Sequence, residues 1–235
     1  MLETIGQALR ATGIELLDLC FPPTCAACRE PRSSSGGPFC LSCARALEPV
    51  PPGCQRCGLP GPDRMCGACR TSPPAFDALH AAGLFGGPLA DAIHAFKYQD
   101  RPALARTLGA WLADQVGIPV GAAIVSVPLG SHRRRARGYD QAALLARALA
   151  RCARGRLRRR WLRRVRETAP QVGKSREERA RNVTGAFQAS ADVAGMDLVL
   201  VDDVVTTGAT VRACAEALKS AGARSVTVVS LARAE

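Results

Sequence analysis

Residues 198–210 read Leu-Val-Leu-Val-Asp-Asp-Val-Val-Thr-Thr-Gly-Ala-Thr. The first four residues form a continuous apolar run, which is typical of a β-strand that helices bury on both faces. The adjacent carboxylates of Asp202 and Asp203 come next, and they can accept hydrogen bonds from the two vicinal hydroxyls of a ribose. The threonine-rich remainder leads into a predicted helix at 209–221, where backbone N–H groups and the helix dipole favour a phosphate. This order of strand, carboxylate pair, phosphate loop and helix decides the fold.

A surface turn with a helix cap is the usual explanation for an isolated Thr-Gly pair. Here thirteen positions agree with the predicted strand and helix, which is a much more specific pattern. The segment closely resembles the signature of phosphoribosyltransferases that bind 5-phosphoribosyl 1-pyrophosphate (PRPP). The resemblance implies a type I phosphoribosyltransferase fold, an α/β fold with a parallel sheet, that binds PRPP together with Mg²⁺. It assigns catalysis to Asp202 and Asp203, and PRPP binding to these two residues and to Val204, Thr206, Thr207, Gly208, Ala209 and Thr210.

A second segment supports the same resemblance. A predicted strand at 122–127 continues through Pro128, Leu129 and Gly130 into an arginine-rich run that ends at Gly138. In the resembled fold, the loop after this strand binds the pyrophosphate. Glycine lets the backbone approach an anion and arginine supplies paired donors, although a solvated or nucleic-acid-facing patch is the alternative interpretation of the run. We expect the loop to contact pyrophosphate through Pro128, Leu129, Arg133 and Arg137.

The rest of the chain after residue 76 alternates predicted helices with predicted strands. This alternation predicts a parallel sheet with right-handed crossovers. A further, amphipathic helix is expected near the N-terminus, at 2–19. The remaining expected helices are 88–97, 102–116 and 139–152, and the remaining expected strands are 197–202, 225–231 and a weaker one at 160–165.

Eight of the 11 cysteines form four Cys-x-x-Cys pairs within residues 25–69. Two such pairs supply the four thiolates that a structural Zn²⁺ site needs, so the pairs predict two zinc sites. Neighbouring pairs, or the first with the third and the second with the fourth, can share a site. Cys20, Cys152 and Cys214 are expected in the core. The expected ligands are Cys25, Cys28, Cys40, Cys43, Cys54, Cys57, Cys66 and Cys69.

The composition changes near residue 75. Residues 22–75 are rich in Cys, Pro, Gly and Ser and hold few apolar residues, so metal is expected to replace a core. We therefore predict an N-terminal helix plus double zinc-ribbon domain at 1–75 and a phosphoribosyltransferase-like domain at 76–235.

Most of the net charge of +12 lies in the second domain and favours polyanionic partners. No apolar run of membrane-spanning length and no signal peptide is apparent, which predicts a cytoplasmic protein.

Further motifs resemble the ComF family of competence-associated phosphoribosyltransferase homologues. They are Leu-Leu-Asp-Leu-Cys-Phe-Pro-Pro at 16–23, Phe-Lys-Tyr at 96–98, Arg-Gly-Tyr-Asp-Gln at 137–141 and the segment 164–187. The sequence departs from the family at Asp140, where Asn is usual, and at Lys174, where Leu is common. The resemblance implies a role in natural transformation, in which imported single-stranded DNA enters the cytoplasm with the help of a helicase partner. We also place Lys97 among the PRPP-binding residues.

Nine arginines and no acidic residue lie between Arg151 and Arg166, together with Trp161. A solvated basic face and a nucleic-acid surface both fit such a run. The expected contacts to single-stranded DNA are Arg158, Arg159, Arg160 and Trp161. The polar segment 167–183 is a candidate for a mobile hood over the ligand.

Two functional hypotheses follow. The first is a Mg²⁺-dependent phosphoribosyltransferase with an unassigned acceptor, acting in DNA uptake. The second is a zinc-ribbon accessory protein that binds single-stranded DNA and uses the same pocket for a phosphorylated ligand without turnover.

Overall fold

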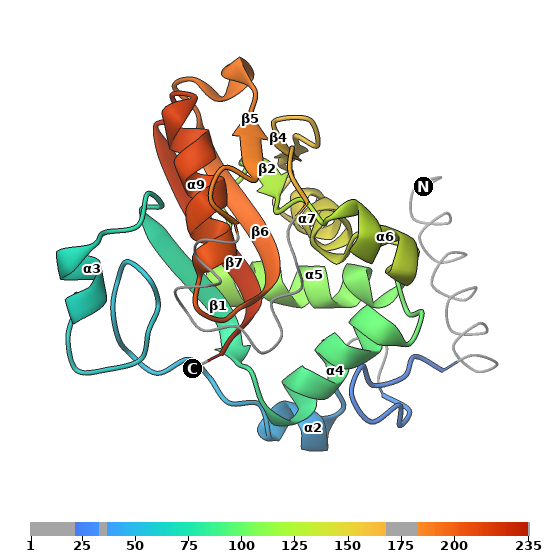
Figure 1. Ribbon diagram of the computed structural model, residues 1–235. Helices are drawn as coiled ribbons and strands as arrows, with labels where there is room; N and C mark the ends of the chain where they lie inside the picture. Colours follow the sequence, from blue (N-terminus) through green and yellow to red (C-terminus); the bar gives the residue numbers. More distant parts are fainter. Residues whose placement is uncertain (1–21, 33–36, 168–182, 235) are drawn as a thin grey trace, which may run out of the picture.

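The computed structural model describes residues 22–32, 37–167 and 183–234 (Figure 1). Its centre is a five-stranded parallel sheet with the spatial order β1-β7-β6-β2-β3. This arrangement confirms the expected α/β fold with a parallel sheet. The strands are β1 (Ala78–Leu84), β2 (Ala123–Ser126), β3 (Arg156–Leu157), β6 (Asp197–Val205) and β7 (Ser225–Arg233).

Helices cover the two faces of the sheet in separate groups (Figure 1). One face carries α4 (Gly87–Tyr98), α5 (Leu104–Val116) and α7 (Gln141–Cys152), and the other face carries α9 (Ala209–Ser220). Successive side chains of a strand point to opposite faces of the sheet, so β6 contributes residues to the core on each face. Val199 and Val201 pack on the three-helix side, whereas Leu198 and Leu200 pack on the α9 side.

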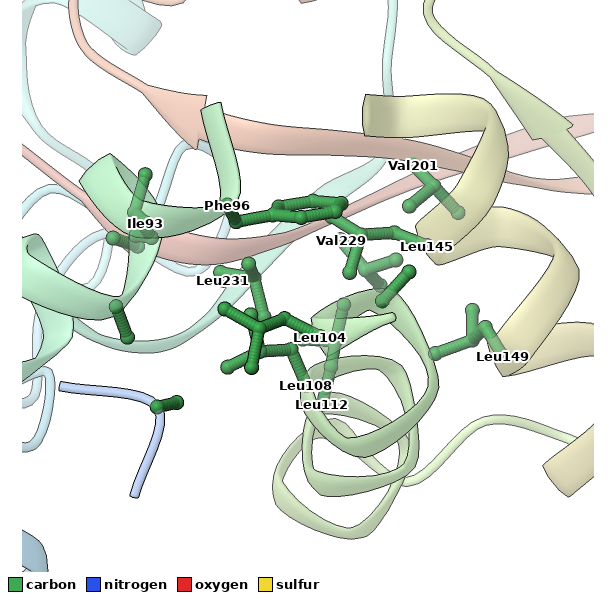
Figure 2. Packing of buried hydrophobic residues seen from close by; sticks show 14 of the residues in the cluster. Ile93, Phe96, Leu104, Leu108, Leu112, Leu145, Leu149, Val201, Val229 and Leu231 are labelled. Atoms are coloured by element: carbon green, nitrogen blue, oxygen red, sulfur yellow. The ribbon is translucent and has the colours of Figure 1, made fainter. Parts of the chain in front are cut away.

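The three-helix side is closely packed around Phe96 and the leucines of α5 and α7, as Figure 2 shows. Gly109 of α5 lets this helix approach α7. A Cβ atom at position 109 would lie 2.5 Å from the Cβ of Ala148. A larger residue there would force the two helices apart.

A separate two-stranded antiparallel sheet joins β4 (Leu162–Arg164) and β5 (Phe187–Ala189), and the 3₁₀-helix η1 (Ala191–Val193) follows it. The weak strand expected at 160–165 therefore exists as β4, but it does not join the parallel sheet. The expected strands at 197–202 and 225–231 extend to Val205 and Arg233, because the two strands pair with each other along this added length.

Other expectations were wrong or incomplete. Cys152, expected in the core, is exposed at the end of α7. The arginine-rich run, expected as a loop, forms the helix α6 (Ser131–Arg137), since Arg and Ala are good helix formers. The strands β1 and β3 were not expected. β1 pairs with β7 along the edge of the sheet, and this partner is distant in sequence. The expected helix at 2–19, Cys20 and most of segment 167–183, including Lys174, lie outside the described residues.

The cysteine-rich part contains two short helices, α2 (Leu41–Arg45) and α3 (Gly67–Thr71), and packs against the cores on both faces of the sheet. Phe39 meets Trp111 of α5 edge to face, with ring centroids 5.4 Å apart. Cys57 packs against the core on the α9 side of the sheet, and the neighbouring Gly58 lies close to Leu79 of β1. The division into domains at residues 75 and 76 remains a prediction.

Candidate functional site

A cleft of about 700 Å³ opens at the carboxyl ends of β2 and β6. The chain leaves β2 toward α7 on one face of the sheet, and it leaves β6 toward α9 on the other. Neighbouring parallel strands whose connections diverge in this way leave a crevice between them, and α/β proteins bind ligands there. Every residue expected to bind PRPP lines this cleft: Lys97, Pro128, Leu129, Arg133, Arg137, Asp202, Asp203, Val204, Thr206, Thr207, Gly208, Ala209 and Thr210.

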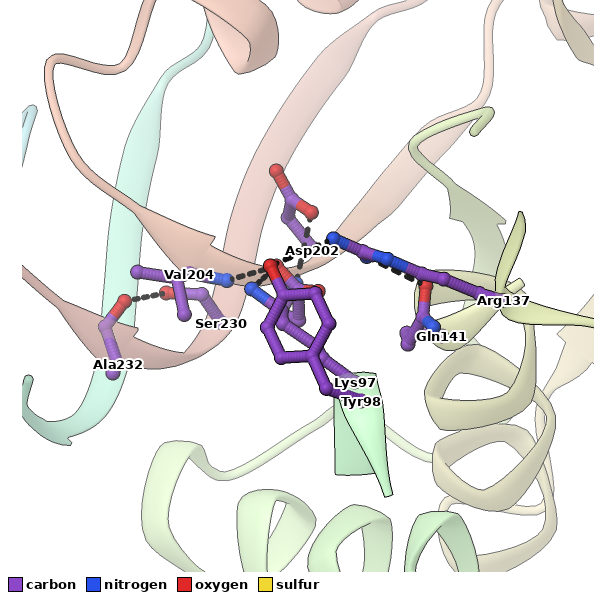
Figure 3. Close-up of polar contacts among 9 residues, drawn as sticks. Lys97, Tyr98, Arg137, Gln141, Asp202, Val204, Ser230 and Ala232 are labelled. Carbon is purple, nitrogen blue, oxygen red and sulfur yellow. Dashed lines mark hydrogen bonds and ion pairs between the residues drawn. The ribbon is translucent and has the colours of Figure 1, made fainter. Parts of the chain in front are cut away.

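The two carboxylates lie within β6, near its end, and not after the strand as the sequence suggested. Each accepts a hydrogen bond from the next backbone N–H: Asp203 N donates to Asp202 Oδ1 at 2.8 Å, and Val204 N donates to Asp203 Oδ1 at 2.7 Å. The Nζ of Lys97 lies 3.0 Å from Asp203 Oδ1 (Figure 3). Burial and the neighbouring charge of Asp203 raise the pKa of Asp202 to about 8.

The threonine-rich loop joins β6 to α9. Gly208 caps α9 with a φ of 77°, a left-handed conformation that glycine adopts without strain. The Oγ1 of Thr207 accepts a long hydrogen bond of 3.4 Å from Ala209 N. Arg233 of β7 is buried and donates to the carbonyl oxygens of Val205 and Thr206, so it holds the start of the loop. The loop therefore offers backbone donors and hydroxyls at a helix N-terminus, which suits a phosphate.

The segment after β2 lines the opposite wall of the cleft. Asp140 caps α7 by accepting from Ala143 N at 3.0 Å, and it also accepts from Leu129 N at 3.3 Å. Burial raises its pKa. The carboxylate of Glu167 contacts the backbone of this segment: Ser131 N donates a hydrogen bond to Glu167 Oε1 at 2.6 Å. A Cβ atom at Gly130 would lie 2.7 Å from Glu167 Oε2, so glycine is what permits the approach.

Other residues that line the cleft had no assigned role in the sequence. Those with aromatic or polar side chains are Phe85, Tyr98, Gln141, Asp140 and Arg164. Tyr98 and Gln141 belong to motifs that resemble the ComF family, which was the only signal available for them. Arg164 opens the segment 164–187, which resembles the same family. No local pattern marks Phe85, because only the folded chain brings it to the cleft.

The cysteines form two clusters, Cys25/Cys28/Cys40/Cys43 and Cys54/Cys57/Cys66/Cys69, and the sulfur atoms of each lie within 4.8 Å of one another. Neighbouring pairs therefore share a site, which resolves the pairing that the sequence left open. The distance between Cys28 Sγ and Cys40 Sγ is 3.6 Å, and that between Cys57 Sγ and Cys66 Sγ is 3.7 Å. Four thiolates around zinc at about 2.3 Å stand about 3.8 Å apart, so both clusters fit structural zinc.

The residues expected to contact DNA lie around β3 and β4. The guanidinium of Arg158 stands 4.8 Å from the centre of the Trp161 ring, while Arg159 and Arg160 are exposed. The stack is half-buried, with Trp161 packed against the core on the α9 side, and the two exposed arginines lie between its residues in the sequence.

The fold and the site define a protein with a phosphoribosyltransferase fold and two cysteine-rich zinc ribbons. A family model described as phosphoribosyl transferase domain matches residues 137–235, and one described as double zinc ribbon domain matches residues 16–71. In the part of the chain that the structure describes, no helix is long and apolar enough to cross a membrane.

Curated relatives match almost the whole chain. The DNA utilization protein YhgH of Salmonella typhi is 37% identical over 231 residues, which cover 92% of this chain and 99% of the relative. The protein of the same name from Escherichia coli strain K12 is 35% identical, with coverages of 92% and 99%. Competence protein F of Haemophilus influenzae is 31% identical, with coverages of 89% and 96%. The chain belongs to the family of these proteins, the ComF family that its motifs resemble.

Proposed function

We propose that the cleft binds a 5-phosphoribosyl group, with Mg²⁺-PRPP as the ligand, and that the protein acts in the uptake or use of DNA. The observation that carries the proposal is the position of the carboxylate pair and the threonine-rich loop on one strand and its turn, at the crevice between β6 and β2. The phosphoribosyl transferase match to this segment supports it.

In this proposal, each part of the ligand contacts a different group of lining residues. Thr206, Thr207 and Thr210 would hold the 5-phosphate, and Asp202 and Asp203 would accept hydrogen bonds from the ribose hydroxyls. Arg133 and the backbone of Pro128 and Leu129 would contact the diphosphate. Arg137, which the sequence grouped with them, is instead held on the cleft wall by hydrogen bonds to Tyr98 and Gln141. Carboxylate oxygens are ligands that Mg²⁺ accepts together with substrate phosphates, so the carboxylate pair fits a cation that arrives with PRPP.

A transfer reaction at this site would form a bond from an acceptor nucleophile to C1 of the ribose while the C1–O bond to pyrophosphate breaks. Pyrophosphate would leave with that electron pair, and the acceptor would release its proton. The chain's contribution would be to position both reactants and to stabilise the leaving charge through Arg133.

The role in DNA metabolism rests on the relatives, which are named for DNA utilization and competence. We place the activity in the cytoplasm, where the zinc thiolates stay reduced, and expect the helicase partner that the family resemblance implies.

A second candidate function is favoured by the Arg158–Trp161 stack. In this version the protein is an accessory factor that binds single-stranded DNA on Arg158, Arg159, Arg160 and Trp161, and its cleft holds a phosphorylated ligand without turnover. Aromatic rings and guanidinium groups bind unpaired bases and phosphates in this way.

Calorimetric titration with Mg²⁺-PRPP, ribose 5-phosphate and pyrophosphate tests the binding proposal. We expect PRPP to bind more tightly than either fragment, because it engages both walls of the cleft. Absence of binding by all three would contradict the proposal. Release of pyrophosphate from PRPP in the presence of nucleobases or amines would then favour the enzyme, whereas single-strand binding without release would favour the accessory factor.

A further inference from the structure

Aromatic residues are scarce in this chain, which contains six Phe, two Tyr and two Trp. Four of the phenylalanines are buried in the core: Phe39, Phe76, Phe96 and Phe187. Among the described residues, the large hydrophobic side chains that are exposed include two aromatic ones, Phe85 at 40% and Tyr98 at 60%. Both of them line the cleft that holds the carboxylate pair. Exposed aromatic surface gathered at one site is typical of a binding surface.

The fold fixes both rings at the cleft. Phe85 follows the last residue of β1, and its N–H donates to the carbonyl oxygen of Arg233 at 2.8 Å. Tyr98 ends α4 and directly follows Lys97, whose ammonium contacts Asp203. The tyrosine ring is therefore one residue away from the side chain that reaches the proposed ribose site.

Arg137 adds a third flat group. Its guanidinium lies 4.8 Å from the centre of the Tyr98 ring, and two hydrogen bonds hold it in place. Nη2 donates to Tyr98 Oη at 3.0 Å, and Nη1 donates to Gln141 Oε1 at 3.1 Å (Figure 3). Gln141 itself is buried at the start of α7. The result is a preorganised stack of an aromatic ring and a planar cation on the wall of the cleft.

We propose that Phe85, Tyr98 and Arg137 form a subsite for a planar heterocyclic base attached to C1 of the bound ribose 5-phosphate. The inference rests on the proposed phosphoribosyl site, and it names a nucleotide, or the nucleobase that becomes part of one, as the molecule recognised. A base has a π-face that stacks on tyrosine and arginine, whatever its hydrogen-bonding edge. The three groups therefore select for planarity more than for one particular base.

The test compares two probes that differ in the base alone: adenosine 5′-monophosphate and methyl β-ribofuranoside 5-phosphate. We expect the wild type to bind the nucleotide about tenfold more tightly, which is within the usual contribution of stacking one base on an aromatic side chain. The ratio of the two affinities should fall to about 1 in Tyr98→Ala and be reduced in Phe85→Ala. It should stay near the wild-type value in Tyr98→Phe, which keeps the ring but removes the hydroxyl.

Val120→Ala is the matched control, because Val120 is an exposed apolar residue outside the cleft lining, with 81% exposure. It should leave both affinities unchanged. Since each variant is judged by the ratio of two affinities, a general loss of folded protein does not change the result. Equal binding of the two probes by the wild type, or an unchanged ratio in Tyr98→Ala, would overturn the base subsite while the phosphoribosyl site stands. If neither probe binds, the phosphoribosyl site fails and the base subsite fails with it.

Discussion

Lys97 Nζ lies 3.0 Å from Asp203 Oδ1, so a cation from the end of α4 faces one carboxylate of an adjacent pair on β6. The side chains of both residues are largely buried, at 15% and 14% exposure. The second carboxylate, that of Asp202, accepts a hydrogen bond from Asp203 N, and its pKa is raised to about 8. Where the ribose is proposed to bind, the free protein thus holds one carboxylate that contacts a lysine ammonium and one whose pKa is raised.

The raised pKa of Asp202 predicts a pH-dependent stability. Between its ordinary pKa of about 3.9 and the folded value of about 8, the folded state keeps a proton that the unfolded chain has lost. The wild type should therefore lose stability as pH rises toward 8, by at most about 1.4 kcal/mol per pH unit. Asp202→Asn lacks this component, so its advantage over the wild type should grow between pH 6 and pH 8 and then level off.

Urea unfolding at several pH values between 6 and 9 measures this difference. Asp114→Asn, at an exposed position on α5, serves as the control and should run parallel to the wild type. Parallel profiles for Asp202→Asn and the wild type would show that Asp202 ionises at its ordinary pH.

Asp140 should stabilise the fold as a helix cap, because its carboxylate accepts from Ala143 N and from Leu129 N. Asp140→Ala should lower the free energy of unfolding by about 1 kcal/mol. Asp140→Asn keeps an acceptor for Ala143 N and removes a charge that burial disfavours, but its amide NH₂ cannot accept from Leu129 N, so its loss should be smaller than that of Asp140→Ala. Chemical denaturation of the three proteins gives the comparison, and equal losses in the two variants would rule out the cap as the cause.

The purified protein should contain about two zinc ions per chain, since eight thiolates form two tetrahedral sets. Cys40→Ser and Cys66→Ser remove corresponding ligands, and each should reduce the ratio to about one.

Cys66 lines a small cavity of about 170 Å³ together with Thr206 and Thr207 of the phosphate loop. Cys66→Ser should therefore weaken Mg²⁺-PRPP binding more than Cys40→Ser does.

Metal analysis by mass spectrometry and calorimetry on the same samples measure both effects. A zinc content near zero in the wild type would contradict the metal sites. Equal PRPP affinities in the two variants would show that the second ribbon does not support the loop.

Single-strand binding should depend on the basic surface around Trp161. Replacing Arg158, Arg159 and Arg160 with alanine should weaken binding, and each lost phosphate contact should reduce the salt slope by about 0.7. The control replaces three exposed arginines of the zinc ribbons, Arg45, Arg64 and Arg70. Fluorescence anisotropy at several salt concentrations gives the slopes. A change in the control alone would move the DNA site to the ribbons.

The parts of the molecule that could be predicted from sequence are those in which local pattern and tertiary role agree. The apolar run, the carboxylate pair and the threonine loop at 198–210 lie in the strand, cleft and turn that they indicated. The Cys-x-x-Cys spacing likewise indicated both clusters, because each knuckle is local. The pairing of knuckles needed the structure, since spacing alone allows two arrangements.

The parts that could not be predicted depend on partners distant in sequence. β1 reads Ala-Leu-His-Ala-Ala-Gly-Leu, without a β-branched residue, and it is a strand because it pairs with β7. The run 131–137 carries no apolar stripe, so the helix α6 left no periodic signal. Phe85 and Tyr98 are separated by the whole of α4, and only the fold brings both rings to one cleft.

The central claim is that the cleft binds a phosphoribosyl group through the carboxylate pair, and the double variant Asp202→Asn/Asp203→Asn tests it most directly. The variant should keep the fold, because Asp and Asn have nearly the same size and no cavity opens, although Asp203→Asn loses the ion pair with Lys97. Two charge-assisted hydrogen bonds at about 1.5–3 kcal/mol each would be weakened or reversed. Calorimetry with Mg²⁺-PRPP should therefore show binding to the wild type and none to the variant, whereas equal affinity for both proteins, or no binding to the wild type, would contradict the account.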